Sequence, residues 1–316
     1  MQPVRIHFRL ASRSSFCLVI LEALVVAACS RSAPQAPPKP PPPPLEYLGE
    51  WGVKGEGPGQ LSRPICLAVD FAGRVYVADA GNGFVHKFDP QGEPLLAFQE
   101  TGLRLPTDIA VDQSGAIYVA DAVRSSVFIF YPDGTRFRQI RCAHKGGSKE
   151  PLGVTVDDDG NMFVMHPDSH KVQKFNPRGR LVKVWDAGDG VGEFAYPVKA
   201  AVGPDGLLYV VDARGNRNLR FTRDGDLVSA WGTAEAGSGE IRGLFGIAIS
   251  GKYVFADDVN HRVHAWTLDG QHKLSDNLGG RLAHDSLARD IAVSPDGELL
   301  VLDPAGPRVL RFRINF

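Results

Sequence analysis

The chain has 316 residues, 43% of them hydrophobic, and a formal charge of −1. Because 35 glycines and 23 prolines interrupt it, the sequence excludes long helices but retains enough apolar residues for a large core. A charge so close to zero also argues against a nucleic acid or another polyanion as the partner.

Residues 1–28 are predicted to be a lipoprotein signal peptide. Three arginines precede an apolar stretch over residues 16–26, and small residues follow it, which is the layout of a secretory signal. The closing VAAC, which ends at Cys29, resembles the lipobox of bacterial lipoproteins, and this resemblance implies that Cys29 is lipidated. Glu22 departs from the pattern because it places a carboxylate in the apolar stretch. Simple secretion, an uncleaved anchor and a misassigned start are the alternatives.

Residues 29–44 are predicted to form a lipidated cysteine followed by a proline-rich spacer. The run APQAPPKPPPPP over residues 33–44 favours an extended, semi-rigid polyproline conformation, because proline fixes φ and donates no backbone hydrogen bond. An ordinary disordered linker is the alternative interpretation. A lipid anchor and spacer of this kind predict a protein of the bacterial cell envelope, held at a membrane and facing the periplasm or the exterior.

Six copies of one unit occupy residues 45–316, which are predicted to form a single domain. In each unit two apolar, β-rich runs flank a short turn, a third run follows, and a glycine turn leads into a fourth. The second runs are apolar at consecutive positions, so both of their faces must be covered. They end at regularly spaced residues: Asp79, Asp121, His166, Asp212, Asp257 and Asp303. Such units predict an all-β fold, a six-bladed β-propeller of four-stranded antiparallel blades.

The sequence also predicts how the ring of blades closes. The last unit ends after its third run at Phe316, whereas an isolated strand-like segment, YLGEWG, stands at residues 47–52 and matches LVSAWG at residues 227–232. We therefore expect the N-terminal segment to supply the missing fourth strand of the last blade. Such closure leaves no large unpaired sheet edge.

The repeated unit resembles the NHL repeat. The resemblance rests on GEGPGQL and the runs that follow it over residues 55–92, and on DDVNHRVHAW at residues 257–266, and it covers nearly all of residues 45–316. It implies a six-bladed propeller of a kind that commonly serves as a binding scaffold and that has several enzymatic relatives. Blade four departs from the pattern, since Asn218 stands where an aliphatic residue is usual.

A candidate binding face follows from the strand directions. The starts of the innermost strands and the loops after the second strands emerge at one end of the propeller, where binding residues concentrate. Asp108, Lys199 and Asp290 come from alternate blades and are expected to converge there, with Arg289 as a second cation. They either contact a polar partner or form a solvated ion-pair ring that closes the channel. The surrounding loop residues of this candidate partner site are Arg124, His166, His170 and Arg214.

The pattern favours a non-catalytic binding scaffold, monomeric and without cofactor or metal, that engages an envelope protein, a peptide or a glycan on this face. The alternative is a propeller enzyme, either a metal-dependent hydrolase similar to lactonases or a lyase similar to the peptidyl-hydroxyglycine amidating enzymes. The latter hold zinc with histidines directly after the proline that precedes an innermost strand, and a catalytic zinc needs such convergent ligands. No histidine occupies the corresponding positions, which are Ile65, Thr107, Leu152, Val198, Phe245 and Arg289.

Two further kinds of metal site are weaker candidates. The pairs His166 with His170 and His261 with His264 have a suitable residue type, but polar loops explain them as well. His166 replaces the aspartate that ends the second run in the other five units, and that aspartate is expected to cap its turn. The repeated Asp-x-x-Gly turns resemble calcium ligands in composition, although hairpin turns need these residues for backbone reasons.

Overall fold

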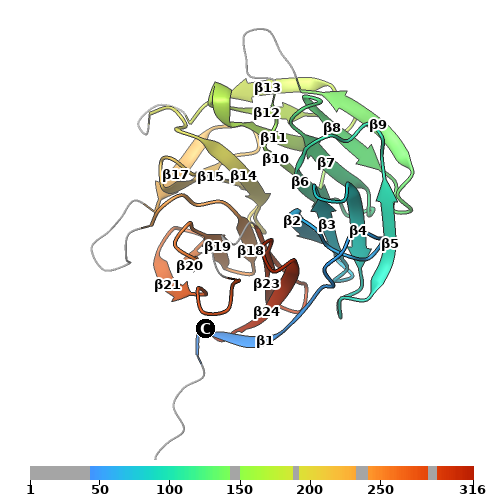
Figure 1. The fold of residues 1–316 in the computed structure, drawn as a ribbon. Helices are drawn as coiled ribbons and strands as arrows, with labels where there is room; N and C mark the ends of the chain where they lie inside the picture. The colour runs from blue at the N-terminus through green and yellow to red at the C-terminus, as the bar shows by residue number, and fades with distance from the viewer. Residues whose placement is uncertain (1–42, 143–149, 188–191, 233–240, 284–289) are drawn as a thin grey trace, which may run out of the picture. The chain divides into compact units, whose positions relative to one another are not determined.

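The computed structural model describes residues 43–142, 150–187, 192–232, 241–283 and 290–316. Within these ranges 24 strands form six four-stranded antiparallel sheets, arranged in a ring like blades (Figure 1). The predicted all-β, six-bladed propeller is confirmed. The predicted signal peptide, Cys29 and nearly all of the proline-rich spacer lie outside the described residues, as does Arg289.

The blades follow one another along the chain, and the strands of blades one to five are hydrogen-bonded in sequence order, whereas blade six takes β1 as its outer strand. Blade one contains β2 (Pro64–Val69), β3 (Val75–Asp79), β4 (Phe84–Phe88) and β5 (Pro94–Gln99), and blade two contains β6 (Pro106–Val111), β7 (Ile117–Asp121), β8 (Ser126–Phe130) and β9 (Arg136–Arg141). Blade three contains β10 (Gly153–Val156), β11 (Met162–His166), β12 (Lys171–Phe175) and β13 (Leu181–Trp185), with the short 3-10 helix η1 (Pro167–Ser169) after β11. Blade four contains β14 (Pro197–Val202), β15 (Leu208–Asp212), β16 (Arg217–Phe221) and β17 (Leu227–Trp231), and blade five contains β18 (Ile247–Ser250), β19 (Tyr253–Asp257), β20 (Arg262–Thr267) and β21 (His272–Asn277). Blade six contains β22 (Asp290–Val293), β23 (Glu298–Asp303), β24 (Arg308–Ile314) and β1 (Leu45–Trp51).

The ring closes through its N-terminal strand, as the sequence predicts. β1 pairs antiparallel with β24, from Leu45 opposite Ile314 to Trp51 opposite Val309 (Figure 1). The ring of Trp51 then lies 4.8 Å from the ring of Phe88 in blade one. One short segment thus completes blade six and ties it to its neighbour.

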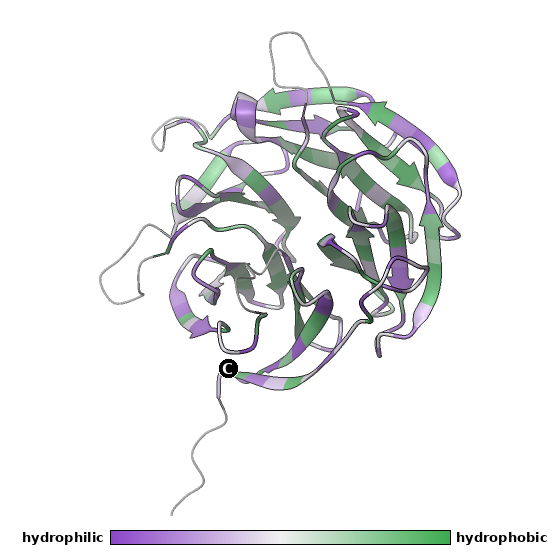
Figure 2. Ribbon diagram, in the orientation of Figure 1, coloured by the Kyte–Doolittle hydropathy of each residue, from purple (hydrophilic) through white to green (hydrophobic). Residues whose placement is uncertain are grey.

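The core lies between the blades. The second strands are buried along their length, and the inner strands are predominantly hydrophobic (Figure 2). Buried hydrophobic side chains form six clusters, each shared by two neighbouring blades. This is why the second strands are apolar at consecutive positions instead of alternating. In the part of the chain described, no helix has the length and hydropathy needed to cross a membrane.

Aromatic side chains of outer strands fix the spacing between blades. Trp185, at the end of β13, packs on Gly225 in the turn between β16 and β17 of the next blade. A Cβ atom at Gly225 would lie 2.6 Å from the tryptophan ring, and the φ angle there is +83°. Glycine is therefore required twice over at this turn, once for space and once for its left-handed backbone. Trp51 and Trp231 make the same contact with Gly92 and Gly270.

The antiparallel order gives the propeller two distinct ends. The first strand of each blade begins, and the second strand ends, at what we call the mouth face. The turns between first and second strands and between third and fourth strands lie at the opposite end, the turn face. Since β24 runs from the mouth face to the turn face and β1 is antiparallel to it, the chain enters β1 from the turn face.

Candidate functional site

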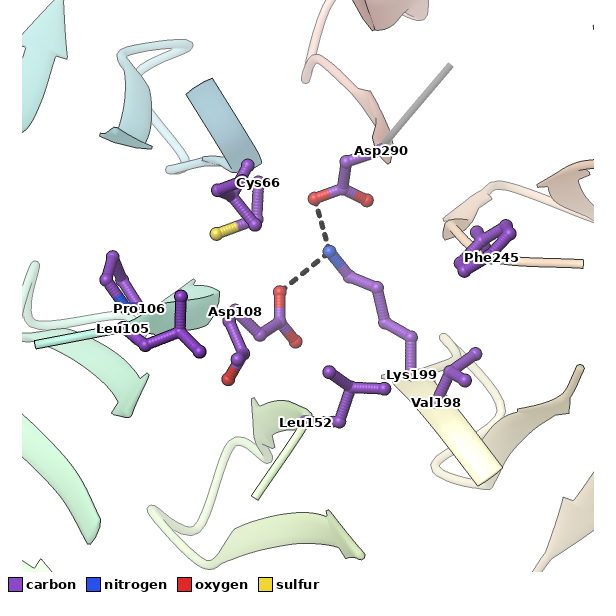
Figure 3. Close-up of a pocket in the computed structure, with 11 residues that line it drawn as sticks. Cys66, Leu105, Pro106, Asp108, Leu152, Val198, Lys199, Phe245 and Asp290 are labelled. Carbon is purple, nitrogen blue, oxygen red and sulfur yellow. Dashed lines mark hydrogen bonds and ion pairs between the residues drawn. The ribbon is translucent and has the colours of Figure 1, made fainter. Parts of the chain in front are cut away.

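A pocket of about 200 Å³ opens at the mouth face, where the innermost strands begin. Its wall is apolar and comes from blades one to five: Ile65, Leu105, Leu152, Val198 and Phe245 (Figure 3). The polar lining residues are Cys66, Thr107, Asp108, Lys199 and Asp290. The pocket therefore combines a hydrophobic surface with one compact charged group.

The charged group consists of three side chains from alternate blades (Figure 3). The ammonium of Lys199 lies 2.8 Å from Oδ1 of Asp108 and also contacts Oδ2 of Asp290. The prediction that these three residues converge is confirmed. Both carboxylates are only 1% exposed, and the Lys199 side chain is 13% exposed. The group is therefore buried, which corrects the expectation of a solvated ring.

Backbone hydrogen bonds from neighbouring blades explain this burial. Asp108 accepts one hydrogen bond from the backbone nitrogen of Val154 in blade three, at 2.8 Å. Asp290 accepts the equivalent bond from Leu67 in blade one, at 2.9 Å. Each carboxylate also accepts a bond from the backbone nitrogen of the residue after it. Both aspartates thus link their blade to the next one, in addition to holding Lys199.

The electrostatics of the group keep Lys199 charged. Burial lowers the pKa of its ammonium, but the carboxylates of Asp108 and Asp290 more than offset this and hold the pKa above its ordinary value. Burial raises the pKa of Asp290 to about 6, although Lys199 opposes the shift. Burial also raises the pKa of the Cys66 thiol well above its usual range. Lys199 is therefore a poor base and Cys66 a poor nucleophile.

A further buried carboxyl, Asp257, neighbours this group. Its Oδ1 accepts a hydrogen bond from the backbone nitrogen of Gly246 at 2.6 Å, while its Oδ2 has no hydrogen-bond partner in the described part of the chain. Burial, and then the negative charge of Asp290, raise the pKa of Asp257 to about 7. Asp79 shows the contrast, because it accepts bonds from several backbone nitrogens, those of Ser62 and Gly81 among them.

We expect Asp257 to make the protein less stable as the pH rises. Its folded pKa of about 7 exceeds the ordinary 3.8, so folding favours the protonated form, and this stabilisation is fully present below pH 3.8 and is lost as the pH rises to about 7. The substitution Asp257→Asn should raise stability at pH 8 by about 1–3 kcal/mol, the cost of a buried unpaired polar group, and change it little at pH 3.5. Thermal unfolding between pH 3.5 and pH 8 measures this. The exposed Asp296→Asn is the control, and an equal shift of both variants at both pH values would contradict the assignment.

The surrounding candidate residues lie at different depths. Arg124 is exposed and donates a hydrogen bond from Nε to the carbonyl of Gly102 at 2.9 Å. Arg214 is exposed and stacks over the ring of Tyr196 at 4.2 Å.

The two histidines of blade three are less accessible. His170 is half-buried, and its Nδ1 lies 2.6 Å from the carbonyl oxygen of Phe194. His166 is fully buried at the end of β11, so it does not present its ring on the mouth face. Of the predicted partner-site residues that lie within the described ranges, only Asp108, Lys199 and Asp290 line the pocket.

The repeated aspartates support the backbone. At the end of β7, Asp121 accepts hydrogen bonds from the backbone nitrogens of Leu105 and Arg124. In the first turns, Asp70 accepts bonds from Ala72 and Arg74 in the same way. The interpretation as turn caps is confirmed for Asp79, Asp121 and Asp303, whereas Asp212 and Asp257 accept backbone bonds from the segment that leads into their blade.

The residues do not fit a zinc site of the amidating type. Five of the six positions that such enzymes use line the pocket here, but they carry aliphatic, hydroxyl or aromatic side chains that do not suit zinc. His264 is buried in blade five, where it contacts Asp258 at 3.1 Å and Ser275 at 2.7 Å. No group of three or more His, Cys, Asp and Glu side chains within the described ranges is arranged to hold a metal. Cys66 and Cys142 are free and buried.

Two features of the site were missed from sequence. The apolar wall has a direct signal in the sequence, because the residues just before the innermost strands include Ile65, Leu152, Val198 and Phe245. The unpaired Asp257 has no sequence signal, because an aspartate ends the second strand in four other blades as well.

Known proteins resemble this chain in part. The family model of the NHL repeat matches residues 103–130, in blade two. Peptidyl-glycine alpha-amidating monooxygenase of Mus musculus is 26% identical over 156 residues, which are 45% of this chain and 15% of the relative. Peptidyl-alpha-hydroxyglycine alpha-amidating lyase 1 of Drosophila melanogaster is 34% identical over 90 residues, 26% of this chain and 16% of the relative. The matched part is thus about one sixth of each relative's length.

Solved structures share the fold at low sequence identity. A streptogramin B lyase structure superposes with a TM-score of 0.63 at 13% identity, over 86% of this chain and 98% of that one. A catalytically inactive virginiamycin B lyase from Staphylococcus aureus with quinupristin gives a TM-score of 0.62 at 12% identity, over 84% and 85%. At these identities only the fold is shared. The chain is thus a six-bladed β-propeller whose second blade contains a sequence that matches the NHL repeat.

Proposed function

We propose that this propeller is a lipid-tethered protein of the bacterial cell envelope that binds an apolar segment of a peptide or protein in the mouth-face pocket, without catalysing a reaction on it. The observation that carries the proposal is the pocket itself, with its apolar wall around a buried ion pair. Apolar walls with a few fixed polar groups are typical of ligand sites. A glycan suits this lining less well than an apolar peptide side chain does.

The comparisons give independent support for a peptide ligand. Two of the similar proteins are named for action on peptidyl substrates. This favours a peptide over other ligand classes for the mouth-face pocket.

An enzyme, a lyase similar to those relatives, is the second candidate, and the sequence similarity to them favours it. The side chains in the pocket argue against it. Lys199 is held protonated between two carboxylates, and Cys66 is held as the neutral thiol. Neither group is prepared to take a proton from a substrate or to attack one.

Binding and mass analysis of recovered peptides separate the two candidates. We expect acetylated tetrapeptide amides rich in Leu, Phe and Val to bind the purified protein and to be recovered with unchanged mass. The double variant Leu152→Ala/Phe245→Ala, which shortens the pocket wall, should bind them about tenfold more weakly, since each truncation removes buried apolar area. Leu95→Ala, on an exposed outer strand, is the control. Recovery of a converted peptide would favour the lyase, and equal binding by all three proteins would exclude the pocket.

A further inference from the structure

The pocket offers a ligand few hydrogen-bonding groups. The hydroxyl of Thr107 is already used, because it lies 3.0 Å from the carbonyl oxygen of Pro151 and 3.3 Å from that of Ala120. The thiol of Cys66 is a weak donor and is buried, with 2% of its surface exposed. The remaining polar lining residues are the three members of the charged group.

Within the charged group, Lys199 has an N–H group that is not bonded to either aspartate. An ammonium has three N–H groups. Two are directed to Asp108 and Asp290, and among the residues that the structure describes the ammonium makes no third hydrogen bond. Lys199 lines the pocket and is the most exposed member of the group. A ligand that enters the apolar opening therefore meets one available N–H.

The charge around this N–H restricts what can accept from it. With both aspartates ionised, the group carries one positive and two negative charges. A ligand carboxylate at Lys199 would gain one attraction but would lie close to two buried carboxylates, in surroundings where such repulsion is poorly screened. A neutral oxygen accepts the same hydrogen bond without that repulsion.

A cationic ligand is disfavoured for a different reason. The four carboxylate oxygens of Asp108 and Asp290 each already accept at least one hydrogen bond. A ligand ammonium would also have to approach the Lys199 ammonium, which bridges both carboxylates (Figure 3).

We infer that the mouth-face pocket selects ligands whose apolar body ends in a neutral hydrogen-bond acceptor, such as an amide carbonyl, and excludes those ending in a carboxylate or an amine. This inference rests on the proposed function, since it names the chemical class of ligand for the same pocket. The acceptor binds the third N–H of Lys199, and the apolar body packs on Ile65, Leu152 and Phe245.

Three matched dipeptides test the inference. Acetyl-Leu-Phe-amide is neutral, acetyl-Leu-Phe with a free C-terminus is anionic, and Leu-Phe-amide with a free N-terminus is cationic, while the apolar body is constant. At pH 7.5 we expect calorimetry or methyl chemical-shift titration to show at least tenfold tighter binding of the neutral ligand. Equal or tighter binding of either charged ligand would overturn the inference and leave the proposed function intact. Failure of all three to bind would remove the proposed function, and the inference with it.

A variant and a pH change identify the source of the selectivity. In Asp108→Asn/Lys199→Met/Asp290→Asn all three charges are removed together, and we expect the preference for the neutral ligand to fall to within about threefold. Because this variant replaces buried groups, the wild-type protein provides a second measurement. At pH 5, where Asp290 and the neighbouring Asp257 gain protons, the anionic ligand should bind relatively more tightly than at pH 7.5. A preference that neither change reduces would show that Lys199 and its carboxylates do not set it.

Discussion

The substitution Lys199→Met should destabilise the propeller by about 3–5 kcal/mol, the range found when one partner of a buried ion pair is removed. Methionine has nearly the length of lysine, so the variant removes the charge with little loss of volume. Asp108 and Asp290 would then remain buried beside each other without their shared cation. Chemical denaturation at pH 7.5 measures the effect, which is a large part of the stability of an ordinary domain.

An exposed ion pair of the same length is the control for Lys199. The ammonium of Lys171 lies 2.8 Å from a carboxylate oxygen of Asp186, the same distance as between Lys199 and Asp108. The side chains of Lys171 and Asp186, however, are each more than one third exposed. Lys171→Met should therefore cost no more than about 1 kcal/mol. The triple variant Asp108→Asn/Lys199→Met/Asp290→Asn should recover part of the stability that Lys199→Met loses. A loss below about 1 kcal/mol for Lys199→Met would show that the buried pair contributes little.

Removal of the closing strand should have the second large effect. A chain that begins at residue 52 lacks β1, so β24 loses the partner on its outer edge and remains paired only with β23. Val309, Leu310 and Phe312, all fully buried, then lose the strand beside them. Each such side chain contributes about 1.5–3 kcal/mol when buried. We expect loss of cooperative thermal unfolding, binding of a hydrophobic dye and association through the free edge of β24.

A chain that begins at residue 43 is the control for the closing strand, because it retains every residue of β1. A synthetic peptide with the sequence LEYLGEW, residues 45–51, should restore cooperative unfolding to the shortened chain when added in excess. Cooperative unfolding of the shortened chain at the wild-type temperature, without the peptide, would show that closure is dispensable.

The fold could be predicted almost completely because its information is local and repeated. The four runs of each unit, their turns and the match between residues 47–52 and 227–232 are visible without any contact map. The convergence of Asp108, Lys199 and Asp290 could also be predicted, because the strand order alone places the start of every first strand at one end of the propeller.

Burial at the site could not be predicted, because it depends on contacts distant in sequence. The backbone nitrogen that holds Asp290 belongs to Leu67, 223 positions away. A sequence pattern shows that a charged side chain reaches the channel, but only the neighbouring blade determines whether water reaches it.

The entry of the chain into β1 from the turn face has a practical consequence. A group attached directly before Leu45 joins the propeller at the end opposite its opening. Labelling or coupling at that point therefore leaves the lining of the pocket uncovered.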